Sequence, residues 1–565
     1  MPDLTEMIYS NDYADYLLRS YVLNQEEIQQ LPPENYRGLM LNTQYSSFFA
    51  RRDTSRFSFQ ASYNAIPKLY MPLSTEALEV SGILRIQNQP LLDLTGRGVL
   101  IGFLDSGIDY THPAFLDSRG QSRILRIWDQ SIRSESYPLS FPYGTEYSQE
   151  ELNRALASTD PFSLVPTRDE TGHGTALAGI AAGTADPPQE FTGAAPGAGI
   201  LVVKLKTAKQ YLKDLFFFSG QDSVYQENDI IAGFAYLVQT AAELQMPLII
   251  CLALGTNQGG HSGSLPLSAV LNRYGDLPGI VPVVACGNEA GRSHHYFPNI
   301  SSGTDYDNVE ILVPENSRGF LCEIWGQAPQ KLSVGFRSPV GEIIPRIPIT
   351  LQQSEEIEFT LEDTVIQVEY NLILPSSGSQ LILLRFEAPT PGIWEIRVYS
   401  SDGERNDYHI WLPMYGFTEP DIVFLTPDPY TTLTAPSDAE AVLSTGTYNS
   451  ADGSLYIYSG RGFTRLLDIK PDITAPGVSL TAPGPQKSFI SFTGSSAAAA
   501  LTAGAAALLM EWRMKRGRGS YLTAYETKIY FIRGAGRQAG ILYPSREWGY
   551  GTLDLYQTFS SIMPT

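Results

Sequence analysis

The strongest constraint on the fold is a series of continuously apolar runs separated by stretches of helical periodicity. The apolar runs lie at residues 99–104, 200–205, 247–254 and 280–286. Helical patterns lie between them, at residues 174–182 and 229–244. Strands that are apolar at every residue are buried on both faces, and intervening helices provide the crossovers that parallel pairing needs. We therefore expect an α/β domain whose parallel sheet is covered by helices on both faces.

Between about residues 305 and 425 the apolar residues alternate with polar ones. The alternating sets are Val309/Ile311/Val313, Leu332/Val334/Phe336, Ile357/Phe359/Leu361, Leu381/Leu383, Trp394/Ile396/Val398 and Tyr408/Ile410/Leu412. Short strands at this spacing predict an antiparallel sandwich of jelly-roll type. The α/β pattern resumes near Ala435, so the sandwich interrupts one domain. We expect the sandwich to pack against the α/β body and rigidify it; the alternative is a carbohydrate-binding module.

The chain is accordingly divided into three units. These are residues 1–75, an α/β domain formed by residues 76–300 and 431–565, and the inserted sandwich of residues 301–430. Within the first unit we predict a helix at residues 12–21 and a turn at residues 31–33, followed by an aromatic-rich segment that ends at Arg52. Nothing in that unit indicates catalysis.

Charge and composition exclude several classes of partner. The net charge of −21 disfavours nucleic acid and anionic membrane surfaces. No apolar run is long enough to cross a membrane. The first residues are acidic where a secretory signal is basic, so we expect no export by that route and a cytoplasmic location. The three cysteines are Cys251, Cys286 and Cys322; Cys251 and Cys286 lie in apolar runs and are interpreted as buried hydrophobic residues of a reducing compartment.

Residues 491–512 predict a buried helix that begins near Ser496. Gly494 and two serines precede a long run of alanine and leucine, a pattern that is apolar on most faces. At a helix start, unpaired N–H groups and the helix dipole stabilise a developing negative charge, as in acyl transfer. Taken alone, the same pattern is more typical of an N-cap serine on a core helix.

Two further segments place an acid and a base in suitable positions. Asp105 ends an apolar strand, and the carboxyl ends of parallel strands are where open α/β sheets bind ligands. His173 lies between two glycines at the start of a predicted helix. Each residue has a structural alternative, since Asp105 is also a common turn former.

Together, the segments Asp105-Ser-Gly, Gly172-His-Gly-Thr and Gly494-Ser-Ser-Ala, in the order Asp, His, Ser, resemble the signatures of the subtilisin-like serine protease family. Further similar segments are Ala253-Leu254-Gly255, Val284-Ala-Cys-Gly-Asn288, Asp472-Ile-Thr-Ala-Pro-Gly and Tyr550-Gly-Thr-Leu-Asp. The resemblance covers about residues 98–297 and 435–555. It implies a subtilisin-like α/β fold.

The resemblance also implies a role for each matched residue. Ser496 would be the nucleophile, His173 the general base and Asp105 the residue that orients the imidazole. Asn288 would line the oxyanion hole. Ala253, Leu254 and Gly255 would form the strand that binds a protein or peptide substrate.

The sequence departs from the family at three places. Ser495 replaces the usual threonine before the nucleophile. Ala114 stands where the family has an acidic calcium ligand, so we expect no metal and no other cofactor. The sandwich begins soon after Asn288, where the S1 pocket is normally formed. Glu289 is the basis of a hypothesis that the S1 pocket prefers a basic residue.

In architecture the chain resembles the clostridial spore-germination subtilisin-like proteases. That resemblance implies an N-terminal pro-segment that acts as chaperone and inhibitor, lies in the active-site cleft and is cut there by the enzyme itself. Residues 69–75 have the extended, proline-containing character of such a strand. The implied substrate is a spore cortex-lytic proenzyme, and the location is cytoplasmic or spore-associated. The alternative is a catalytically silent receptor or scaffold with the same fold.

Overall fold

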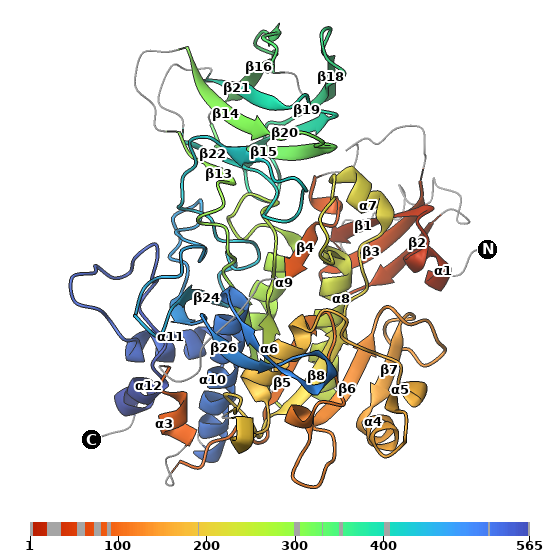
Figure 1. Cartoon of the computed structure of the whole chain (residues 1–565), viewed down its shortest axis with the longest axis vertical. Coiled ribbons are helices and arrows are strands. Elements are labelled where there is room, and N and C mark those ends of the chain that lie inside the picture. The colour runs from red at the N-terminus through yellow and green to blue at the C-terminus, as the bar shows by residue number, and fades with distance from the viewer. Residues whose placement is uncertain are drawn as a thin grey trace.

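The computed structural model has three parts that lie against one another: the α/β body at the bottom of the view, the inserted sandwich at the top, and a small N-terminal unit at the side (Figure 1). The structure describes residues 4–19, 36–52, 63–72, 81–87, 92–189, 191–298, 305–329, 331–349, 354–400, 407–517 and 520–562.

The body contains an eight-stranded sheet in the order β25-β24-β12-β10-β5-β8-β6-β7. Its strands are β5 (Leu100–Asp105), β6 (Ile124–Asp129), β7 (Thr145–Ser148), β8 (Gly199–Lys204), β10 (Leu248–Leu252), β12 (Ile280–Ala285), β24 (Leu443–Tyr448) and β25 (Ile473–Pro476). Neighbouring strands pair in parallel, except that β7 runs antiparallel to β6 at one edge. The predicted α/β domain with its parallel sheet is confirmed.

Helices cover both faces of this sheet. Helices α6 (His173–Ala182) and α10 (Ser495–Lys515) lie on one face, and α8 (Glu227–Glu243) and α9 (Pro266–Gly275) lie on the other. The remaining helices of this part of the chain are α3 (Ile83–Gln87), α4 (Gln149–Leu156), α5 (Pro161–Leu164), α7 (Gln210–Leu215), α11 (Ala524–Gly534) and α12 (Leu555–Ile562). Side chains of β5 alternate between two hydrophobic clusters: Ile101 and Phe103 join the cluster of α6 and α10, whereas Leu100 and Leu104 join that of α8 and α9. This double burial explains why the strand is apolar throughout.

The alanine-rich helix α10 packs closely against its neighbours. A Cβ atom at Gly504 would lie 2.4 Å from the Cβ of Ala194 and 2.7 Å from the carbonyl oxygen of Ala181 in α6. A larger residue at this position would therefore push the two helices apart. The small residues after Ser496 fix where α10 begins relative to α6.

Two antiparallel sheets form the sandwich, in the orders β13-β22-β15-β20-β19-β18 and β17-β16-β21-β14-β23. The strands are β13 (His295–Tyr296), β14 (Tyr306–Val313), β15 (Gly319–Gln327), β16 (Leu332–Arg337), β17 (Ile343–Ile344), β18 (Ser354–Glu358), β19 (Val365–Asn371), β20 (Ser379–Glu387), β21 (Gly392–Ser400), β22 (Tyr408–Trp411) and β23 (Val423–Phe424). Four of the six predicted alternating sets lie within strands, and a fifth extends one residue beyond β22, at Leu412. The extension of one strand to Leu361 was wrong, because β18 ends at Glu358 and Leu361 is exposed. The jelly-roll topology stays a prediction.

The central strands β15 and β20 of the six-stranded sheet are buried on both faces, whereas its edge strand β18 is largely exposed. Cys322 and Ile324 of β15 point into the core of the sandwich, whereas Leu321 and Trp325 belong to the hydrophobic cluster of the body. The sandwich therefore packs against the body through this sheet. The double burial also removes the polar-apolar alternation from β15, which explains why this strand was not predicted.

The N-terminal unit consists of α1 (Leu4–Tyr9), β1 (Tyr13–Arg19), β2 (Tyr36–Met40) and β3 (Tyr45–Arg51), with the strands in the antiparallel order β1-β3-β2. The helix predicted at residues 12–21 was wrong, because seven of these residues pair with β3 as a strand. The spacing of Ala14 and Leu17 is typical of one helix face, but in the strand the two side chains point to opposite faces and join different hydrophobic clusters. The long-range pairing with β3 therefore overrides the local pattern. Residues 20 and 21 and the predicted turn at residues 31–33 lie outside the described residues.

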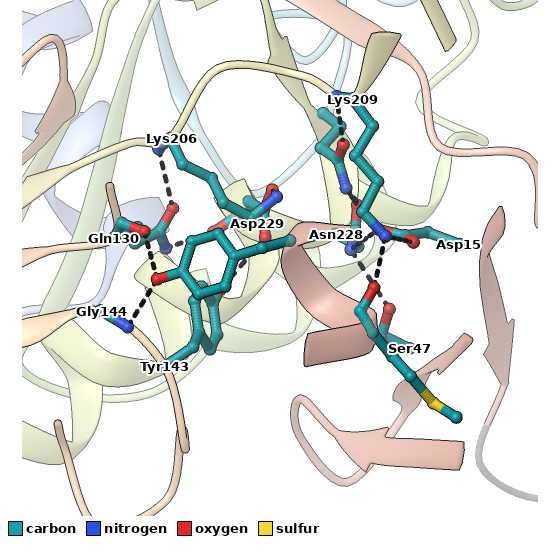
Figure 2. A network of polar contacts seen from close by, with 12 residues as sticks. Asp15, Ser47, Gln130, Tyr143, Gly144, Lys206, Lys209, Asn228 and Asp229 are labelled. Carbon is teal, nitrogen blue, oxygen red and sulfur yellow. Dashed lines mark hydrogen bonds and ion pairs between the residues drawn. The ribbon is translucent and has the colours of Figure 1, made fainter. Parts of the chain in front are cut away.

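The contact between the N-terminal unit and the body centres on the buried carboxylate of Asp15 (Figure 2). Lys209 forms an ion pair with it through Nζ. Gln226 and Asn228 donate side-chain hydrogen bonds to its other oxygen, at 2.6 and 3.3 Å. Asn228 also donates to the hydroxyl of Ser47 at 3.2 Å. One carboxylate thus neutralises a buried cation and ties β1 to the body.

We predict that Asp15→Asn loosens this contact. The substitution leaves the ammonium group of Lys209 buried without its counter-charge, which lowers the free energy of unfolding by about 3 kcal/mol. Denaturant unfolding of the full chain measures the effect, and Asp12→Asn, at an exposed position, is the control, with a change below about 0.5 kcal/mol. Equal unfolding free energies for the two variants would contradict the prediction.

Candidate active site

The structure brings Asp105 and His173 together at the carboxyl end of the central strand. Asp105 ends β5, His173 begins α6, and His173 Nδ1 lies 2.7 Å from Asp105 Oδ1. The same carboxylate oxygen accepts the backbone N–H of Ser106 at 2.8 Å. Both side chains are buried. When the carboxylate accepts a hydrogen bond from the Nδ1–H group, the neutral imidazole keeps its proton on Nδ1 and offers Nε2 as a base.

Asp169 holds the two segments in place and was missed by the sequence analysis. Its Oδ1 accepts the hydroxyl of Ser106 at 2.8 Å, which joins it to the Asp105 loop. Its Oδ2 accepts the backbone N–H and the hydroxyl of Thr175 at 2.8 and 2.7 Å, in the first turn of α6. The available signal was an aspartate a few residues before a helix start, a position typical of capping.

Backbone contact between the two segments depends on Gly174. A Cβ atom there would lie 2.2 Å from the carbonyl oxygen of Gly107, closer than any real side chain allows. The glycine that follows His173 therefore lets α6 start directly against the loop that follows Asp105. This close approach brings together the two segments that carry Asp105 and His173.

Ser496 lies in the first turn of α10 and is buried. Its Oγ makes no hydrogen bond within the described part of the chain, so it is not hydrogen-bonded to His173 in this structure. The imidazole lies near this helix start, since its ring is 5.4 Å from that of Phe492, which precedes α10 in β27 (Phe489–Phe492). Hydrogen bonds of this kind often tighten only when a substrate binds.

Asn288 lies beside the start of α10. The backbone N–H of Ser495 donates to Asn288 Oδ1 at 3.1 Å, which orients the side-chain amide and leaves Nδ2 as its donor. The hydroxyl of Ser495 accepts the backbone N–H of Gly287 at 3.2 Å. Ser495 thus tethers the segment that precedes Asn288 to α10.

The expected substrate-binding strand is occupied by the chain's own N-terminal region. Residues Leu254–Gly255 form β11, which pairs antiparallel with β4 (Leu69–Pro72). On its other side β4 pairs antiparallel with β9 (Tyr225–Gln226). Leu69 and Tyr70 of β4 are completely buried. Ala253 directly precedes β11 and is buried. An extended segment is therefore held between two strands of the body.

Glu289 does not lie at the rim of a pocket, so the hypothesis that it selects a basic residue was wrong. Its side chain is buried, and its Oε2 lies 2.6 Å from His294 Nδ1 and 3.1 Å from the donor Asn257 Nδ2. His294 Nε2 in turn lies 3.1 Å from both carboxylate oxygens of Asp421 in the sandwich. Burial lowers the pKa of His294, but Glu289 and Asp421 outweigh it and raise that pKa to about 9. The protonated imidazole thereby links the residue after Asn288 to the sandwich.

Several predicted features have simple structural roles. The three cysteines are buried and unbridged. His112, in the segment that contains Ala114, accepts the backbone N–H of Ala114 at 3.1 Å and lies 3.0 Å from the carbonyl oxygen of Ser488. In the described ranges, no three His, Cys, Asp or Glu side chains are grouped so that they could hold a metal ion. No helix in these ranges has the length and apolar character needed to cross a membrane.

This fold agrees with the comparison with known families. The model of the subtilase family matches residues 96–317 and 426–551, on either side of most of the sandwich. The chain belongs to the subtilase family.

Among solved structures, the chain is similar to the CspB protease of Clostridium perfringens, with a TM-score of 0.75 and 31% sequence identity over 85% of this chain and 97% of that one. It is also 26% identical to pyrolysin of Pyrococcus furiosus over 35% of this chain, and 25% identical to the PI-type proteinase of Lactococcus lactis over 45%. The matched regions span 14% and 12% of the lengths of these last two relatives.

We predict that His294 makes stability fall at alkaline pH. Because its pKa rises from 6.5 to about 9 on folding, the protonated imidazole stabilises the fold fully below pH 6.5, and this contribution is lost as the pH rises through 9. The shift corresponds to about 3 kcal/mol. Urea unfolding between pH 6 and 10 should show this loss in the natural chain and not in His294→Gln.

His295→Gln is the matched control. Burial lowers the pKa of His295 to about 3, so this residue does not titrate on the folded protein above pH 6.5. Its variant should keep the alkaline loss of stability. An equal loss in His294→Gln and in the natural chain would refute the role of His294.

Proposed function

We propose that the chain is a serine endopeptidase that cleaves peptide bonds in protein substrates. Ser496 attacks the scissile carbonyl carbon, His173 accepts its proton at Nε2 and later protonates the leaving amine, and Asp105 holds the imidazole in the required tautomer. The observation that carries this proposal is the 2.7 Å hydrogen bond between His173 and Asp105, formed close to the start of α10.

The negative charge of the tetrahedral intermediate needs donors that are already in place. Asn288 Nδ2 is one, because Ser495 orients its amide through the other end. The backbone N–H of Ser496 is the second, since the first N–H groups of a helix have no partner within it. Both donors would lie near the attacking hydroxyl.

We further propose that the N-terminal region is a pro-segment and that β4 occupies the place of a substrate strand. Pairing with β11 and β9 on both sides is the mode by which extended peptides add to sheet edges. The enzyme would cut its own chain within residues 69–75 and so convert a zymogen into the active form. Leu73, Ser74 and Thr75 lie outside the described residues.

The physiological substrate that we propose is a spore cortex-lytic proenzyme, and the proposed location is cytoplasmic or spore-associated. The similarity to the CspB protease along most of both chains supports this choice. The deep burial of Leu69 and Tyr70 favours a second candidate, a catalytically silent scaffold whose cleft stays filled by its own segment.

Self-cleavage and active-site labelling separate the two candidates. We expect mass spectrometry of the purified natural chain to show a cut within residues 69–75 and a fluorophosphonate adduct on Ser496. Ser496→Ala should lose both, because the attacking hydroxyl is gone. Ser560→Ala, which changes an exposed serine of α12, should keep both. An uncut natural chain that also fails to react with the probe would favour the scaffold.

A further inference from the structure

The groove that holds β4 continues for one residue towards the N-terminus. The backbone N–H of Glu227 donates to the carbonyl oxygen of Lys68 at 2.9 Å, and Lys68 N–H donates to Glu227 Oε2 at 3.4 Å. The next residue, Leu69, donates its N–H to Gln258 Oε1 at 3.2 Å. The body therefore forms hydrogen bonds to the backbone at Lys68, as it does along β4.

The side chain of Lys68 is completely buried. Its ammonium group donates to the carbonyl oxygens of Tyr63 and Ile66 at 2.6 and 2.7 Å and lies 4.0 Å from the centre of the Tyr63 ring. These three contacts all come from the N-terminal region. A lysine with no exposed surface at the end of a peptide groove is costly to bury, so its surroundings must favour a positive charge.

Two buried carboxyl groups contribute the negative charge that favours the ammonium form of Lys68. Glu227 begins α8 in the body, and Glu323 belongs to β15 of the sandwich. Burial lowers the pKa of Lys68 to about 8, while Glu227 and Glu323 both act to raise it. Burial raises the pKa of each carboxyl group, and the charge of Lys68 opposes that rise. The three groups are thus electrostatically coupled in a dry environment.

Glu323 is also the point where all three parts of the protein meet. Its Oε1 accepts the hydroxyl of Tyr63 at 2.6 Å. Its Oε2 accepts the backbone N–H of Gly259 at 2.9 Å and the indole N–H of Trp325 at 3.0 Å. When the N-terminal region leaves, Gly259 and Trp325 keep holding this carboxylate, and the oxygen that Tyr63 occupied becomes available to a new donor.

We propose that Glu227 and Glu323 form a subsite that selects a lysine or arginine of the protein substrate at the position that Lys68 occupies in the bound segment. This inference rests on the proposed function, in which β4 lies where a substrate strand lies. The inserted sandwich then contributes directly to specificity, because Glu323 is one of its residues. A substrate with an apolar residue at this position leaves both carboxylates buried without a cation.

The cleavage pattern of the self-processed full chain on a peptide library tests the subsite. The bond of self-cleavage gives the register, so the position equivalent to Lys68 is known without further assumption. We expect lysine and arginine to be enriched there. For a matched pair of peptides with lysine or methionine at this position, kcat/KM should differ at least about tenfold, because a buried charged group loses its partner.

Variants of the enzyme provide a second test of the subsite. Glu323→Gln should reduce the preference for the lysine peptide at least about tenfold, and Glu358→Gln, at an exposed position of the same sandwich, should leave it unchanged. If Glu323→Gln does not fold, Lys68→Met and Lys68→Arg in the full chain replace it, with slower self-cleavage expected for methionine and near-normal self-cleavage for arginine.

Equal rates on the two peptides, or no enrichment at this position, would overturn the subsite while leaving the protease assignment intact. Failure of both self-cleavage and fluorophosphonate labelling would instead overturn the proposed function.

Discussion

The hydrogen bond between the buried carboxylate of Asp105 and the imidazole of His173 joins residues 68 positions apart. A carboxylate without exposed surface needs hydrogen-bond donors, and those of Asp105 converge on its Oδ1 atom. The end of β5, the start of α6 and the turn anchored by Asp169 meet at this point. The backbone N–H of Ser106 donates a second hydrogen bond to the Asp105 carboxylate, and the Ser106 hydroxyl donates to Asp169. The parallel sheet makes this meeting possible, because its carboxyl ends place loops from different strands at one edge.

The inserted sandwich is tied to this edge at two places. His294 lies between Glu289, the residue after Asn288, and Asp421 of the sandwich. Glu323 of the sandwich receives a hydrogen bond from Tyr63, a few residues before β4. Strands β15 and β20 of the six-stranded sheet are buried on both faces, so the link through Glu323 lies within an apolar contact. The sandwich thus contacts both the N-terminal region shortly before β4 and the segment beside Asn288.

The sequence was sufficient for features that depend on local patterns. Continuously apolar strands such as β5 indicate a sheet that is covered by helices on both faces. The segments around Asp105, His173 and Ser496 each contain a nearby glycine, and the last two begin helices. Features that depend on distant partners were missed or wrong. Residues 13–19 form a strand because β3 pairs with them. Glu289 is buried because His294 and Asn257 hold it, and Asp169 and Glu323 acquire their roles through residues far away in the chain.

The central claim is that the carboxylate of Asp105 makes His173 an effective base for Ser496. Steady-state kinetics of Asp105→Asn on a peptide substrate test it most directly, with the melting temperature measured in parallel. The account predicts that kcat falls by about four orders of magnitude while the fold persists, since the amide favours the wrong tautomer of the imidazole. A folded Asp105→Asn protein with a kcat close to that of the natural chain would contradict it.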